Sequence, residues 1–131
     1  MIEATRIVGD KDVVAGLNAS GSTIAKGRVV LGTGTAEDEI ALATAASQAF
    51  LGVTTESIAN NTRGGVQIRG KAVCVAGAAV TKGVRVTSDG AGKVIAAAGG
   101  DATLGIAASA AAALDEEFEV WIGSTAPRMP G

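Results

Sequence analysis

One pattern occurs twice in the chain and decides the fold. Residues 24–31 read IAKGRVVL and residues 80–86 read VTKGVRV, so a Lys-Gly step leads into a short aliphatic run in both halves. The later steps also match, in the same order: a Gly-containing turn, an apolar run (residues 40–43 and 94–97), a Leu-Gly step (Leu51-Gly52 and Leu104-Gly105) and an alternating run (residues 66–70 and 118–123). The offset between the halves is 56 residues from Gly27 to Gly83 and 53 from Gly52 to Gly105. This agreement indicates an internal duplication.

Composition favours strands for both halves. Val, Ile and Thr supply 35 of the 131 residues, and turn signals recur every eight to twelve residues, as in all-β sandwiches and barrels. The pair Asp89-Gly90 predicts a hairpin turn. Ala accounts for 27 residues, whereas Leu, Ile, Val and Phe together number 31. A unit of about 50 residues with so little large apolar surface cannot bury a core alone. We therefore expect the two halves to interlock and share one narrow core.

Two Ala-rich segments leave a helical alternative open. Residues 36–49 and 107–114 contain strong helix formers. The repeat favours a strand at residues 40–43, because they match residues 94–97. A short helix at residues 108–114, with a matching one at residues 55–60, stays possible.

The ends of the chain lie outside the repeat. We expect an N-terminal arm (residues 1–11), one β-domain of two pseudo-repeats (residues 12–123, divided at about 12–70 and 71–123) and a C-terminal tail (residues 124–131). Five residues are candidates for contacts with another subunit or partner: Ile2, Arg6, Ile7 and Val8 in the arm, and Trp121 in the last strand. Trp is enriched at interface hot spots, although core packing is the alternative for Trp121.

The residue inventory excludes most chemistry. The chain has no His and one Cys, so imidazole catalysis, a disulfide and a Cys-rich metal site are excluded. Three aromatic residues and a net charge of −2 argue against nucleic-acid binding. No apolar stretch approaches the roughly 20 residues that span a bilayer, and the N-terminus lacks a signal-peptide pattern. We expect a protein that is not an enzyme and has no catalytic residues, cofactor, metal, nucleic-acid partner or membrane partner.

Four local patterns have a functional interpretation that is weaker than the structural one. Residues 65–71 fit the phosphate-loop spacing G-x-x-x-x-G-K, but Ala72 replaces the required Ser or Thr. The acidic clusters at residues 37–39 and 115–117 read as solvated loop rims, with cation binding or an acid–base role for Glu39 and Glu117 as alternatives. Cys74 reads as a buried small residue. Lys26 and Lys82 read as turn residues, or as a pair of interface cations.

The ordered motifs resemble a known family. The Lys-Gly turns, the steps Leu51-Gly52-Val53 and Leu104-Gly105-Ile106, and the small-residue bias over residues 13–123 are similar to the capsid decoration (cement) proteins of tailed bacteriophages, in particular the group carrying the domain of unknown function numbered 2190. The resemblance implies an all-β, compact β-tulip or β-clip-like barrel or sandwich with at most short helices.

The same resemblance carries expectations about function. It implies a structural virion protein that binds the outer surface of a phage head, contacts the major capsid protein, stabilises the shell and forms a homotrimer. It would be assembled in the host cytoplasm and located on the capsid surface. The alternatives are a head-fibre or tail-associated virion protein, and a small non-catalytic β-clip module that binds a ligand.

Overall fold

The protein consists of strands, turns and loops. The computed structural model describes residues 12–33, 37–46 and 49–123, and no α-helix occurs among them. The all-β prediction is therefore confirmed. The strands are β1 (Asp12–Asn18), β2 (Val29–Gly32), β3 (Glu39–Leu42), β4 (Gly52–Thr54), β5 (Thr62–Val75), β6 (Arg85–Ser88), β7 (Val94–Ala96), β8 (Gly105–Ala107) and β9 (Glu117–Ile122).

Five strands close into a barrel, which we call the first barrel. β1 pairs in parallel with β3, β3 pairs with β2, β2 with β4, and β4 with the first half of β5. The ring closes because β1 also pairs with residues 62–69 of β5, over its whole length and in antiparallel register. A closed ring leaves no open sheet edge within this half.

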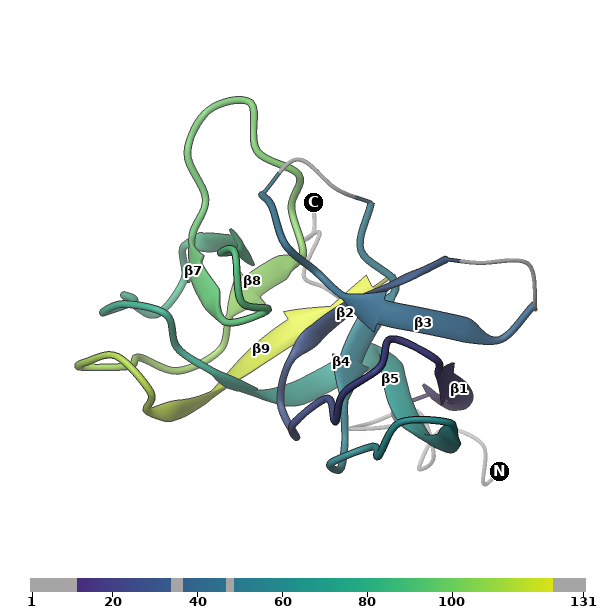
Figure 1. The fold of residues 1–131 in the computed structure, drawn as a ribbon. Coiled ribbons are helices and arrows are strands. Elements are labelled where there is room, and N and C mark those ends of the chain that lie inside the picture. The colour runs from purple at the N-terminus through teal and green to yellow at the C-terminus, as the bar shows by residue number, and fades with distance from the viewer. Residues whose placement is uncertain (1–11, 34–36, 47–48, 124–131) are drawn as a thin grey trace, which may run out of the picture.

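The second half of β5 begins another set of pairings, which we call the second sheet. Residues 70–75 of β5 pair with β9, β9 pairs with β8, β8 with β6, and β6 with β7. A parallel bridge between Val94 of β7 and Ala76, the residue after β5, places β7 beside the end of β5. Figure 1 shows the first barrel and the second sheet side by side, with β5 running through both.

The loops repeat their hydrogen bonds as the strands repeat their pairings. Ile24 exchanges two main-chain hydrogen bonds with Ile58, and Val80 exchanges two with Ala111. The amide of Gly27 donates to Thr54, as the amide of Gly83 donates to Ala107. The repeated sequence pattern therefore corresponds to a repeated pattern of chain pairing.

The two short helices left open from the sequence are wrong. Residues 55–60 and 108–114 contain bends and one isolated bridge residue each, Ile58 and Ala111. Each segment uses its main chain to bridge the loop that precedes a Lys-Gly turn, and this tertiary pairing overrides local helix propensity. The strand expected at residues 40–43 is present as β3.

The expected single shared core is also wrong. One buried cluster contains Ile24, Val30, Ile40, Ile58 and Val66 of the first barrel. A larger one contains the matching Val80, Val86, Val94, Ala111 and Val120. The larger cluster also includes Val29, Ala43 and Val53, which face outward from the first barrel. Each half thus has its own interior, and the second core extends across the junction.

The paired glycines of the repeat occupy positions that a larger residue would strain. Gly27 and Gly83 have φ angles of 79° and 92°, a region that favours glycine in tight turns. A Cβ atom added to Gly52 would collide with the carbonyl oxygen of Gln67, and one added to Gly105 would collide with that of Trp121. The Leu-Gly step therefore permits a close main-chain approach between neighbouring strands.

The predicted hairpin is present between β6 and β7. Its loop spans five residues, because Ser88 pairs with Val94. The Asp89 carboxylate accepts hydrogen bonds from the amides of Ala91 and Lys93, an arrangement in which Asp stabilises a turn through its own side chain.

Candidate interaction site

The structure can locate one of the five candidate contact residues. Ile2, Arg6, Ile7 and Val8 lie outside the described residues. Trp121 lies in β9, where Val120 and Ile122 are buried and Trp121 itself is partly exposed. The alternation of the strand therefore turns the indole ring toward the outer face of the second sheet.

Neighbouring strands hold this ring in place. Trp121 pairs with Lys71 in β5 and with Ile106 in β8. The Lys71 ammonium lies 5.2 Å from the centre of the indole ring, within the range of a cation–π interaction. Lys71 also approaches the Glu119 carboxylate at 3.8 Å. The result is a rigid aromatic residue on an outer surface, flanked by both signs of charge.

The equivalent surface of the first barrel is covered. Val53 pairs with Gln67 as Ile106 pairs with Trp121. Val53 is 1% exposed and Gln67 is 2% exposed, and Val53 packs in the cluster that contains the core of the second sheet. Ile106 and Trp121 are both only partly buried. In the first barrel, the face that carries Val53 and Gln67 is buried. The equivalent face of the second sheet, which carries Ile106 and Trp121, is partly exposed to solvent.

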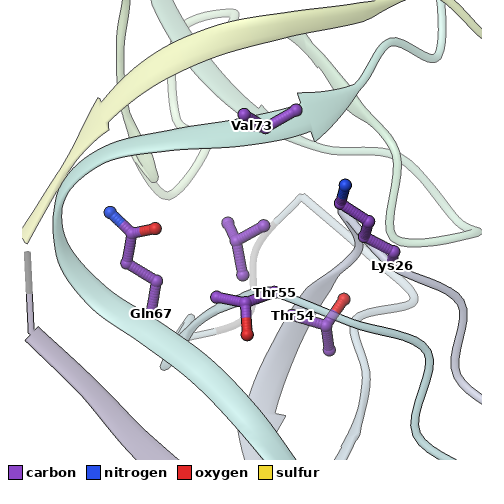
Figure 2. A pocket seen from close by; sticks show the side chains of 6 residues that line it. Lys26, Thr54, Thr55, Gln67 and Val73 are labelled. Atoms are coloured by element: carbon purple, nitrogen blue, oxygen red, sulfur yellow. The ribbon is translucent and has the colours of Figure 1, made fainter.

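A pocket lies where the two halves meet. It has a volume of about 190 Å³ and is lined by Lys26, Val53, Thr54, Thr55, Gln67 and Val73. Figure 2 shows Gln67 and Val73 on the curved β5 strand, with Lys26 on the opposite side of the pocket. Of these residues, sequence reasoning had singled out Lys26 alone. Gln67 was missed because no local signal in an alternating strand reveals that this polar side chain is buried beside a pocket.

The acidic clusters are separated and partly paired. Asp38 accepts a hydrogen bond from Arg63, which lowers the pKa of the Asp38 carboxyl, and the charge of Arg63 acts in the same direction. Asp115 pairs with Lys93, and Glu116 accepts a hydrogen bond from the amide of Ala112. Within the described ranges, no three acidic or Cys side chains are grouped to hold a metal ion. Glu39 lies in β3 and Glu117 in β9, on different halves of the fold.

The other motifs that the sequence suggested have clear places in the fold. Residues 65–71 lie within β5, so the apparent phosphate loop is an extended strand. Cys74 is buried, as predicted, and burial raises the pKa of its thiol. Lys26 and Lys82 are both exposed and lie in the two Lys-Gly turns. No helix long and apolar enough to cross a membrane is found in the part of the chain that the structure describes.

Comparison with known proteins places these features in a family. No curated protein sequence matches the chain. Among solved structures, the head fiber gp8.5 N base in bacteriophage phi29 is similar, with a TM-score of 0.67 and 14% identity over 92% of this chain and 100% of that one. At this identity the likeness concerns the fold. The profile of the phage cement proteins matches residues 8–122, which include both repeats. The chain therefore belongs to the phage cement protein family.

Proposed function

We propose that the protein binds the outer surface of a phage head and cements the shell. Membership of the cement family over residues 8–122 carries this proposal and makes the protein a structural component of the virion. The narrower assignment to the group numbered 2190 stays a prediction. In this proposal the protein acts by binding to the shell and has no catalytic role.

The proposed mechanism is the bridging of neighbouring capsid subunits. Separating two bridged subunits would also break the contacts that the cement protein makes with each. A homotrimer would engage several subunits at once, and multivalent attachment raises avidity without strengthening any single contact. Rigid strands suit this role, since a preorganised surface loses little conformational entropy on binding.

Two regions of the chain are the proposed contact regions. The first is the arm at residues 1–11, which holds Ile2, Arg6, Ile7 and Val8. The second is the outer face of the second sheet around Trp121. Its equivalent in the first barrel is already covered by protein, which supports the idea that a second copy or a capsid subunit covers it.

Native mass and head occupancy test this proposal. Purified protein should have the mass of a trimer in native mass spectrometry. It should also saturate empty heads at a fixed ratio to the major capsid protein, and raise the temperature at which those heads break open. Heads that stay bare at saturating protein concentration would contradict the cement role.

A head-fibre role is the second candidate, and the fold likeness to the phi29 head fiber base supports it. Electron microscopy of decorated particles distinguishes the two. A cement protein would produce density lying flat on the shell at repeated lattice positions, whereas a fibre base would be the foot of a projection.

A further inference from the structure

The pocket between the two halves has rigid walls. The Thr54 hydroxyl donates to the carbonyl of Ala25 at 2.8 Å and accepts from the amide of Arg28 at 3.0 Å. The amide of Gly27 donates to the carbonyl of Thr54, and the amide of Val75 donates to that of Gly27. These bonds tie the Lys26-Gly27 turn to β4 on one side and to β5 on the other. The position of Lys26 is therefore set by the main chain around it.

Gln67 is a buried polar side chain directed into this pocket. It is 2% exposed, and its amide nitrogen donates to the carbonyl of Arg69 at 3.1 Å. That bond orients the amide and leaves its oxygen as an acceptor beside the cavity (Figure 2). A polar group buried to this degree normally has its hydrogen-bonding capacity used.

The other lining groups define what the pocket can hold. Lys26 is exposed at the opposite wall and has no hydrogen-bond or ion-pair partner in the described part of the chain. Thr55 also lines the pocket, with its hydroxyl oxygen next to Gly65, and Val53 and Val73 form apolar walls. At about 190 Å³ the pocket is below the usual range of roughly 300–1,000 Å³ for small-molecule sites. A cation facing an apolar wall in so small a space suits a single carboxylate side chain.

The main chain beside the pocket suits an extended segment. Residues 70–75 of β5 pair with β9, and among the described strands nothing pairs with their other edge. The amide of Val75 points to that other edge, where it meets Gly27. A Cβ on Gly27 would lie 3.5 Å from the carbonyl oxygen of Val73, so this carbonyl points the same way. Because main-chain direction alternates along a strand, the polar groups of Lys71 also lie on this edge.

We propose that this pocket receives a Glu or Asp side chain from an extended acidic segment of the major capsid protein. The proposal rests on the cement function proposed above. The carboxylate pairs with Lys26, and main-chain amides of the segment donate to Gln67 and to the carbonyls of Lys71 and Val73 on the edge of β5 that faces away from β9. Edge pairing supplies affinity and the pocket supplies the choice of side chain, as in other strand-addition complexes.

The repeat provides a matched control. Lys82 stands where Lys26 stands and is exposed in the same way. Ala107 and Ala108 replace Thr54 and Thr55, and Trp121 replaces Gln67, so the second sheet offers the cation without the buried amide. Lys26→Glu and Lys82→Glu change the net charge of the protein equally. A difference in binding between the two variants therefore reports on the pocket beside Lys26.

Head binding and a peptide titration together test the proposal. With heads that the wild type occupies, Lys26→Glu should weaken binding by about tenfold or more, whereas Lys82→Glu should bind as the wild type does. Equal binding by Lys26→Glu and wild type, or equal losses in both variants, would overturn the pocket while leaving the cement function in place. Because Lys26 is exposed, both variants should keep the wild-type melting temperature.

Bare heads with the wild-type protein would refute the cement function. The peptide titration tests the pocket in that case as well, because it needs no heads. The probe is acetyl-Ala-Val-Glu-Val-Ala-amide, followed by NMR of the labelled protein. It should produce saturable shifts in the Gln67 side-chain amide that are lost in Lys26→Glu and in the peptide with Gln in place of Glu. Shifts that are the same for both peptides, or that centre on Lys82, would contradict carboxylate recognition.

Discussion

Gln67 and Trp121 occupy the same position in the two halves of the protein. Each follows a buried Val in an alternating strand and pairs with the residue after a Leu-Gly step, Val53 for Gln67 and Ile106 for Trp121. Gln67 is 2% exposed and lines the pocket where the two halves meet, whereas Trp121 is partly exposed. The same strand geometry thus produces an internal junction in one half and an outer face in the other.

The close main-chain approach at the Leu-Gly steps should be intolerant of a side chain. Gly52→Ala and Gly105→Ala would press a methyl group against the carbonyl oxygens of Gln67 and Trp121. We expect each change to lower the free energy of unfolding by about 2 kcal/mol or more, as overpacking does. Urea denaturation measures this. Gly99→Ala is the control, since nothing lies within 4 Å of its added Cβ, and a loss of similar size there would refute the explanation.

Removal of the exposed indole should affect assembly more than folding. Trp121→Ala should shift the native mass from trimer toward monomer, because aromatic residues concentrate binding energy in interfaces. Sedimentation velocity at several concentrations measures the shift. Leu114→Ala is the matched control: Leu114 is 57% exposed and apolar, and lies in a different loop. An unchanged sedimentation profile for Trp121→Ala would remove this face from the interface.

Deletion of residues 1–11 should weaken head binding and leave the fold intact. The nine strands found in the described residues begin at or after Asp12, so the truncated chain keeps each strand pairing described above. Its melting temperature should lie close to that of the full chain, while its occupancy of heads falls. Undiminished occupancy would show that the arm is dispensable.

The Asp38–Arg63 pair should make stability depend on pH in the acid range. The hydrogen bond from Arg63 lowers the pKa of Asp38 below its ordinary value of 3.8. A lowered folded-state pKa means that the pair stabilises the protein above that ordinary value, and that the contribution is lost as pH falls through the folded-state pKa. The stability gap between wild type and Asp38→Asn should therefore be present at pH 7 and close as the pH is taken below 3.8. Because the pair is exposed, high salt should narrow the gap at pH 7, and a gap independent of pH would contradict this account.

The single thiol should report on unfolding. Cys74 is fully buried, and burial raises the pKa of its thiol, so little reactive thiolate is present. An aromatic disulfide reagent should label the native protein far more slowly than the protein in denaturant. Rapid labelling of native protein would indicate that β5 opens locally, since Cys74 is paired there with Phe118 of β9.

Much of the fold could be predicted because it is local and repeated. The Lys-Gly turns, the Leu-Gly steps and the hairpin at Asp89 each depend on a few adjacent residues, and two occurrences of the same order confirm one another. The helices considered at residues 55–60 and 108–114 were wrong because their helix propensity competes with main-chain bridges to residues 24 and 80. Those bridge partners lie more than 30 residues away in sequence, so no local pattern reveals them.

The candidate site was less predictable for the same reason. The exposure of Trp121 follows from alternation between Val120 and Ile122. The pocket requires Lys26, Thr55 and Val73 to meet, and they come from a turn, the end of a strand and the far half of β5. The bend of β5 brings them together, and a bend is a property of the packed sheets.

The sequence by itself determined that the chain is an all-β duplication with few residues suited to catalysis. Alternation, glycine spacing and the absence of His are properties of the residues alone. Tertiary structure alone decided that β5 belongs to both halves, that each half has its own core, and that equivalent positions face different surroundings. The physical reason is that a strand determines which way a side chain points, whereas what lies on that side depends on which part of the chain packs there.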